Sequence, residues 1–275
     1  MSEKRRIVFV NQEMAPYLTG TPACAAARDL AVGMHKRKYE VRTFMPRFGD
    51  VNERRNQLHE VIRLSGINIP IDDIDHPLII KVASLQPARI QVYFIDNDDF
   101  FQQEASDADS TGSNRADNDE RAIFFARGTA ETVRKLKWNP HIIHCSGWIT
   151  SLIPVILRGS YADDPSFKES RIVYTVRDSR VTGPVSTEMM RRLGEEEVPE
   201  EMLIPFETPE APAGEDGSNP AVFDRLAVSY ADAVIFETPE PDPVLMEIVK
   251  SRGIPFMTAE EASGPDAYHN FYSRL

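Results

Sequence analysis

A short apolar run, an alanine-rich stretch and a second apolar run open this chain, and their order constrains its fold most. Ile7–Val10 is continuously apolar, which predicts a strand covered on both faces. Ala23–Lys38 is rich in Ala, Leu and Met and predicts a helix, with Thr21 as its N-cap and Pro22 in its first position. Glu40–Met45 predicts the next strand. A β-α-β unit of this kind implies a parallel sheet.

A different texture follows between residues 58 and 116. Short runs rich in Ile, Leu and Val alternate with turn signals, which predicts an antiparallel β insertion in the sheet. The expected strands are Leu58–Leu64, Ile67–Ile71, Leu78–Leu85 and Ile90–Ile95. Phe101–Ala116 is polar and rich in Ser, Asp, Gly and Asn, so we expect a surface loop there.

Alternation of helices and strands then resumes. Helices are expected over Asp117–Lys137, Trp148–Leu157, Val185–Leu193, Val222–Tyr230 and Pro243–Arg252, and strands over His141–His144, Arg171–Val176, Ala233–Phe236 and Ile254–Met257. The predicted fold class is α/β, a Rossmann-like doubly wound parallel sheet with an antiparallel insertion. We expect one domain over residues 1–258, with an acidic, proline-rich loop over 194–219 and a C-terminal tail over 259–275.

Charge and cysteine content exclude several classes of function. The chain has 31 Lys and Arg against 43 Asp and Glu, a net charge of −12 that suits neither nucleic acid nor an anionic membrane. No apolar run reaches the roughly 18 residues of a membrane helix. Two distant cysteines, Cys24 and Cys145, provide neither a disulfide scaffold nor a thiolate zinc site. They suit a reducing compartment, so we expect a cytoplasmic protein.

Common catalytic motifs do not occur. There is no P-loop and no G-x-G-x-x-G, so neither NTPase nor NAD chemistry is supported, and no cofactor is expected. Ser146 lacks the flanking glycines of a nucleophile elbow, which argues against a hydrolase. His141 and His144 are three residues apart in an expected strand. They therefore point to different faces and do not form a metal pair.

Six short motifs, in their order and spacing, resemble those of bacterial glycogen synthases and plant starch synthases. These are retaining, ADP-glucose-dependent glucosyltransferases of GT-B type. The sequence also resembles a short Bacteroidetes-type group of glycogen-synthase-like proteins that end after the first domain. The motifs are Val10–Tyr17, Met45–Gly49, Val92–Phe100, Asp117–Arg121 with Phe124 and Phe125, Pro140–His144 with Trp148, and Tyr230–Val234.

The resemblance carries expectations for fold and activity. It implies the N-terminal half of a two-domain GT-B enzyme, whose active site lies between the domains. The implied reaction transfers glucose from ADP-glucose to a growing α-1,4-glucan with retention. The family's second domain supplies most nucleotide contacts, and we expect no counterpart of it within these 275 residues. By this resemblance, the expected ligand is an α-glucan or a sugar nucleotide.

Four loops depart from the family pattern. The family's Lys-x-Gly-Gly aligns with Thr19–Pro22, its His-Asp-Trp with Ser146–Trp148, its Thr-x-His-Asn with Thr175–Asp178 and its Val-Ser-Pro with Glu237–Pro239. A lysine neutralises a diphosphate, and glycines let backbone amides approach it at a helix N-terminus. Here that charge is absent and Pro22 has no amide hydrogen. Structural positions are kept while chemical ones are replaced.

Candidate ligand residues lie where strands end. The candidate cleft comprises Glu13, Tyr17, Thr19, Gly20, His144, Ser146, Trp148 and Arg177. Glu13 faces this cleft or accepts backbone amides, and the second interpretation is favoured. His144 contacts a sugar or is a satisfied polar residue near the core, and again the second is favoured. Arg177 binds an anion or pairs with Asp178 or a nearby glutamate, and these alternatives stay open.

The Asp117–Arg121 motif also has a structural interpretation. Its side chains could bind sugar hydroxyls, but we expect Asp117 or Asn118 to cap the helix and Arg121 to form an internal ion pair.

Three functions follow from these residues. The first is a glycogen or starch synthase-like protein of α-glucan metabolism that does not transfer glucose on its own. The second is a non-catalytic module that binds sugar or glucan. The third is an interaction subunit that pairs with itself or with a separate chain through its open interdomain face.

Overall fold

The computed structural model describes residues 4–102, 110–177, 181–207 and 221–275. Its first three elements are β1 (Arg6–Asn11), α1 (Pro22–Lys36) and β2 (Glu40–Pro46), and β1 pairs with β2 in parallel. Thr21 has an extended backbone, and its side chain accepts a hydrogen bond from the Cys24 amide, as expected of an N-cap. The predicted β-α-β unit is confirmed.

The central sheet has the strand order of a doubly wound fold. The order is β10-β9-β8-β7-β1-β2-β6-β5-β3, with β4 paired to β5. From β1 the parallel sheet is extended on one side by β2 and β6 and on the other side by β7, β8, β9 and β10. The order thus reverses between β1 and β7, which confirms the predicted fold class. The bounds are β6 (Ile90–Asp96), β7 (Ile142–Ser146), β8 (Arg171–Val176), β9 (Ala233–Phe236) and β10 (Phe256–Met257).

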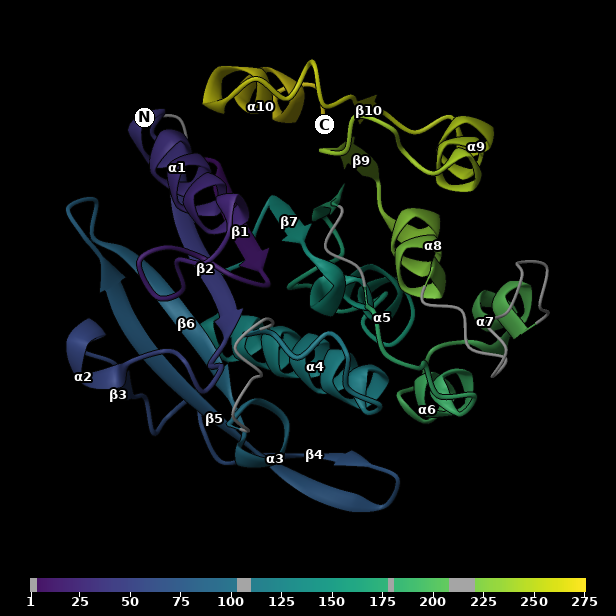
Figure 1. Cartoon of the computed structure of the whole chain (residues 1–275), viewed down its shortest axis with the longest axis horizontal. Helices are drawn as coiled ribbons and strands as arrows, with labels where there is room; N and C mark the ends of the chain where they lie inside the picture. Colours follow the sequence, from purple (N-terminus) through teal and green to yellow (C-terminus); the bar gives the residue numbers. More distant parts are fainter. Residues whose placement is uncertain (1–3, 103–109, 178–180, 208–220) are drawn as a thin grey trace.

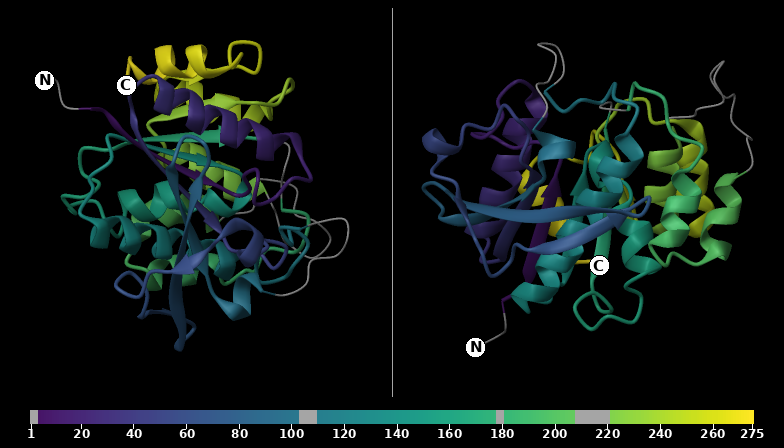
Figure 2. Two further views of the ribbon diagram at one scale, coloured as in Figure 1. Left: turned by 90° about the vertical axis from the view of Figure 1, so that its left-hand side faces the viewer. Right: turned by 90° about the horizontal axis from the view of Figure 1, so that it is seen from below.

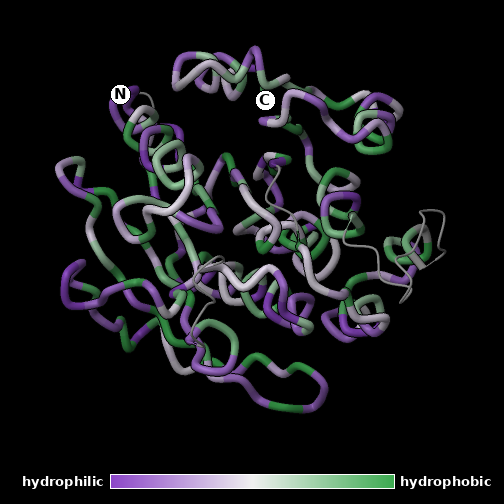
Figure 3. Tube along the Cα trace, viewed as in Figure 1, coloured by the Kyte–Doolittle hydropathy of each residue, from purple (hydrophilic) through white to green (hydrophobic). Residues whose placement is uncertain are grey.

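Helices cover both faces of these strands. Helices α1 and α10 (Pro265–Tyr272) lie side by side on one face, as Figure 1 and the left view of Figure 2 show. On the other face lie α4 (Asn118–Leu136), α5 (Ile153–Arg158) and α8 (Ala221–Tyr230), and α9 (Pro243–Arg252) packs on α8. All residues of β7 and β9 are buried. Figure 3 shows hydrophobic residues on β9, whereas the outer helix α6 (Met189–Glu195) carries both hydrophilic and hydrophobic residues.

The antiparallel insertion is smaller than the sequence predicts. It consists of β3 (His59–Glu60), β4 (Ile67–Ile71) and β5 (Ile74–Leu85). The expectation that Ile90–Ile95 belongs to it is wrong, because this segment pairs in parallel with β2 along one edge and antiparallel with β5 along the other. Its place in the parallel sheet depends on pairing with β2, a strand that is remote in sequence. Only two residues of the expected strand Leu58–Leu64 are extended.

Other predicted loops contain regular structure. Helix α7 (Glu200–Glu207) and the end of α6 lie within the segment 194–219, which we expected to be a loop. Residues 208–220 of that segment lie outside the described residues, as do residues 103–109 of the expected loop 101–116. Short helices α2 (Glu53–Asn56), α3 (Asp98–Phe101) and the 3-10 turn η1 (Trp148–Thr150) complete the described elements. Among them, no helix combines the length and apolar character needed to cross a membrane.

The segment 259–275, expected as a tail, contains helix α10, which packs closely on α1. A Cβ atom at Gly33 would lie 2.5 Å from the Cβ atom of Pro265, so only glycine allows this approach. Arg37 forms an ion pair with Asp266, and the Tyr39 hydroxyl is 3.1 Å from His269 Nδ1. The Arg5 guanidinium donates to the Tyr272 carbonyl at 2.6 Å. The C-terminal helix is therefore part of the domain.

We expect Gly33→Ala to destabilise the protein by about 1–3 kcal/mol through overpacking against Pro265. Glycine inside a helix is ordinarily less stable than alanine by about 0.5–1 kcal/mol, so the sign of the change is diagnostic. Urea unfolding measures both. Gly194→Ala in α6 is the control, because nothing lies within 4 Å of its added Cβ atom. If Gly33→Ala is as stabilising as Gly194→Ala, α10 does not pack on α1 in this way.

Candidate functional site

The candidate site lies at the carboxyl ends of the parallel strands, where ligands bind in open α/β sheets. Strand order reverses between β1 and β7, and their ends are joined by the Gln12 amide, which donates to the Ser146 carbonyl at 2.9 Å. The loops that follow β1, β7, β8 and β9 carry the predicted residues. The structure distributes these residues over three environments: the start of α1, the buried end of β7, and the edge formed by β8 and β9.

The start of α1 is already capped by the chain itself. Thr21 Oγ1 accepts from the Cys24 amide at 3.3 Å, and Pro22 has no N–H to offer. Thr19 and Gly20 are exposed and precede this cap. Of the first residues of α1, Pro22 thus has no amide hydrogen and the Cys24 amide is already bonded.

Glu13 lies beside this first turn and is 6% exposed. It accepts a hydrogen bond from the Cys24 thiol, with 3.2 Å between Sγ and Oε2. This contact corrects the favoured expectation that backbone amides hold Glu13. Burial raises the pKa of the Cys24 thiol, and the Glu13 carboxyl raises it further, while the hydrogen bond from Thr21 opposes both. No sequence pattern indicated Cys24 as the partner of Glu13.

Tyr17 belongs to the core rather than to an open cleft. Its ring is 5% exposed and meets Phe94 edge to face, with centroids 4.9 Å apart. Burial raises the pKa of the phenol to about 12. The ring packs the loop after β1 against β6.

His144 is enclosed beneath α10. Its Nδ1 is 2.6 Å from the Tyr272 hydroxyl, and its Nε2 is 2.6 Å from Thr175 Oγ1. Both ring nitrogens thus have partners, in agreement with the interpretation of His144 as a satisfied polar residue. Burial, with a smaller effect from the positive charge of Arg177, lowers its pKa to about 3. The imidazole is therefore neutral at ordinary pH and out of reach of a ligand.

The end of β7 turns sharply into η1. Gly147 has φ +95°, and a Cβ atom there would lie 2.5 Å from the Cβ of Gln12, so this position requires glycine. Ser146 and Trp148 flank it and are 6% and 2% exposed. Both are therefore buried positions of the turn. The Trp148 Nε1 atom has no hydrogen-bond partner among the described residues.

Arg121 was expected to form an internal ion pair, and its described contacts are of another kind. It donates to the carbonyls of Phe100, Thr111 and Gly112, at 2.9, 2.7 and 3.0 Å, and to Asn118 Oδ1 at 2.7 Å. Its guanidinium carbon lies 5.5 Å from the centre of the Trp148 ring. Arg121 thus fixes the start of α4 and the loop before it beneath the end of β7.

The expected helix caps also differ in detail. Asp117 occupies the N-cap position of α4 without a side-chain capping bond, and it pairs with Arg115 instead. The Asn118 amide donates to the Ser113 carbonyl at 2.8 Å. These contacts hold the loop before α4 in place, which is a structural rather than a ligand-binding role.

Arg177, at the end of β8, pairs with a nearby glutamate. Its Nη2 atom is 2.8 Å from Glu237 Oε2, and the two side chains are 13% and 23% exposed. The other expected partner, Asp178, lies outside the described residues. The Tyr268 hydroxyl of α10 donates to the second oxygen of Glu237. Sequence analysis missed Tyr268 and Tyr272, although their spacing of four residues is a helical signal.

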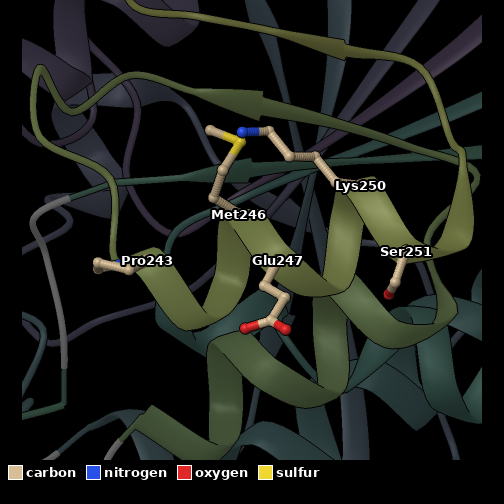
Figure 4. Close-up of a pocket in the computed structure, with 5 residues that line it drawn as sticks. All are labelled: Pro243, Met246, Glu247, Lys250 and Ser251. Atoms are coloured by element: carbon tan, nitrogen blue, oxygen red, sulfur yellow. The ribbon is translucent and has the colours of Figure 1, made fainter.

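No other feature replaces this edge as the site. Among the described residues, no group of three or more His, Cys, Asp or Glu side chains could hold a metal ion. A groove on the outer side of α9 is lined by Pro243, Met246, Glu247, Lys250 and Ser251 (Figure 4). All five come from one helix, and none is a predicted site residue.

Comparison with known proteins identifies relatives for most of the chain. A family model described as the starch synthase catalytic domain matches residues 6–237. Glycogen synthase of Chlorobium luteolum is 32% identical over 194 residues, covering 70% of this chain and 40% of that protein. Glycogen synthase of Chlorobaculum tepidum is 32% identical over 174 residues, covering 63% and 36%. The chain thus spans about two fifths of the length of these relatives.

A solved structure shares the fold. The catalytic domain of starch synthase IV from Arabidopsis thaliana, bound to ADP and acarbose, matches with a TM-score of 0.71. The match covers 93% of this chain and 51% of that one at 17% identity, which relates the folds alone.

The buried state of His144 predicts a pH-dependent stability. The unfolded chain protonates this imidazole below its ordinary pKa of 6.5, whereas the folded protein does so only near 3. Stability therefore falls as the pH drops below 6.5, by about 2 kcal/mol at pH 5 for this one group. Urea unfolding at pH 7.5 and pH 5 should show a smaller loss for His144→Gln than for the unaltered protein.

His35→Gln is the matched control for this prediction, because His35 is exposed on α1. It should keep the pH dependence of the unaltered protein. An equal loss of stability in His144→Gln and in the unaltered protein would show that His144 is not buried as a neutral group.

Proposed function

Because this chain belongs to the starch synthase catalytic domain family, we propose that it is a glycogen synthase-like protein of α-glucan metabolism that does not itself transfer glucose from ADP-glucose. The family implies sugar nucleotides and glucans as the ligand class. The observation that carries the proposal is the first turn of α1, where Thr21 accepts from the Cys24 amide and Pro22 has no N–H.

Free backbone amides are scarce at the first turn of α1. A helix N-terminus binds phosphate through amides that no other group uses. In α1 the Cys24 amide is taken by Thr21, and Pro22 contributes none. Thr19 and Gly20, before the cap, bring no positive charge to replace the lysine of the family motif.

The charges at this edge also disfavour a diphosphate. Stabilising the charge that develops on a leaving group is a dominant contribution to catalysis in most enzymes. Here an acidic side chain, Glu13, is buried beside the first turn of α1. The positive charge of Arg177 is paired with Glu237. A diphosphate at this edge would thus meet acidic groups where it needs cations.

We expect no incorporation of labelled glucose from ADP-glucose into glycogen above an enzyme-free blank. Glycogen synthase of Chlorobium luteolum serves as the positive control. Sustained turnover by the 275-residue chain would contradict the proposal. A second arm adds the remaining part of that relative as a separate polypeptide. If this mixture turns over, the chain acts as one part of a two-chain enzyme; if calorimetry with maltooligosaccharides alone shows heat, it acts as a glucan-binding module.

The closed first turn also predicts a gain of function. The triple variant Thr19→Lys, Thr21→Gly, Pro22→Gly restores the positive charge and the free amides. We expect it to bind ADP about tenfold more tightly than the unaltered chain, which corresponds to about 1.4 kcal/mol. Calorimetry measures the affinity. The same variant with Gln instead of Lys at position 19 separates the contribution of charge from that of the amides. If neither variant gains affinity, the first turn of α1 is not what limits binding.

A further inference from the structure

The contact between Arg177, Glu237 and α10 is not explained by the proposed function. We propose that Arg177 is the centre of an oxyanion site for a phosphate or phosphoryl group at the ends of β8 and β9, which Glu237 occupies and α10 keeps closed. The inference goes beyond the absence of glucose transfer and does not depend on it.

The guanidinium has the form and the position of an anion site. Arginine presents a planar fork of N–H donors that matches the oxygens of phosphate. Glu237 accepts from Nη2 at 2.8 Å, while Nε is buried and has no hydrogen-bond partner among the described residues. Glu237 therefore satisfies this fork only in part. Both side chains are partly exposed at the edge of the sheet, so a small anion can reach the pair.

Tyr268 holds the competing carboxyl in place. Its hydroxyl donates to the Glu237 oxygen that does not face Arg177. Its ring lies 6.0 Å from the His144 ring at an interplanar angle of 29°. His144 in turn bonds to Tyr272, one turn further along α10. The position of Glu237 thus depends on a helix that is anchored to buried side chains of the sheet.

The same helix packs on α1 through Pro265, and Asp266 and His269 bond to residues that directly follow α1. Displacing α10 would therefore release Glu237 and loosen the support of α1 together. In this arrangement an external oxyanion and the Glu237 carboxyl compete for one guanidinium. Removing the charge of Glu237 should favour the external anion strongly, and removing the Tyr268 hydroxyl should favour it less.

Titration with inorganic phosphate, followed by calorimetry at low ionic strength, tests this competition. We expect Glu237→Gln to bind phosphate about tenfold more tightly than the unaltered protein. Glu240→Gln removes the same charge from an exposed position three residues further on, and it should leave the affinity unchanged. The double variant Glu237→Gln, Arg177→Gln should return the affinity to that of the unaltered protein.

Either of two results would overturn the proposal: no gain in Glu237→Gln, or a gain that persists in the double variant. If circular dichroism shows that Glu237→Gln does not fold, Tyr268→Phe replaces it, with an expected gain of about two- to fivefold. Absence of that gain also overturns the proposal. Glucose transfer by the unaltered chain would contradict the proposed function but leave this site intact, because phosphate binding is measured without ADP-glucose.

Discussion

The N-cap of α1 is the interaction on which the character of this edge depends. A helix N-terminus leaves amides unsatisfied, and either the chain or a ligand can satisfy them. Here the chain itself satisfies them: the Thr21 side chain accepts from the Cys24 amide, and Pro22 has no amide hydrogen. This choice makes α1 stable without a ligand. It also leaves fewer free backbone amides that could bind a diphosphate and offset the cost of removing it from water.

A second consequence concerns the position of α10. The helix packs against α1 at Gly33 and against the sheet at His144, so it joins the first β-α-β unit to the ends of β8 and β9. A neutral imidazole between two hydroxyls is a suitable contact for a dry interface, since a charged one would require a buried counterion. The low pKa of His144 and the packing of α10 therefore have one physical cause, which is the exclusion of water from this interface.

The sequence predicts those parts of the structure that depend on local chemistry. The strand Ile7–Val10, the cap at Thr21 and the order of the elements follow from apolar runs and from capping residues, and the structure confirms them. The parallel pairing of Ile90–Asp96 with β2 is not local and was not predicted. The contact of His144 with Tyr272, which is 128 residues away, is equally remote and was not predicted either. Such contacts depend on the whole packing, for which a single sequence gives no periodic signal.

The fold of the sheet does not depend on the two acidic side chains at this edge. Glu13 lies under the start of α1 and Glu237 lies on Arg177, so each position suited to an oxyanion has an internal acidic neighbour. The sheet itself is held by buried apolar residues such as those of β1 and β9, whose packing does not depend on these charges. Substitutions at the ends of strands can therefore change the charges at this edge without loss of the core. The two carboxyls are held by different helices: Cys24 of α1 donates to Glu13, whereas Tyr268 of α10 donates to Glu237. Displacing α10 would therefore free Glu237 from Tyr268 while Glu13 stays bonded to Cys24.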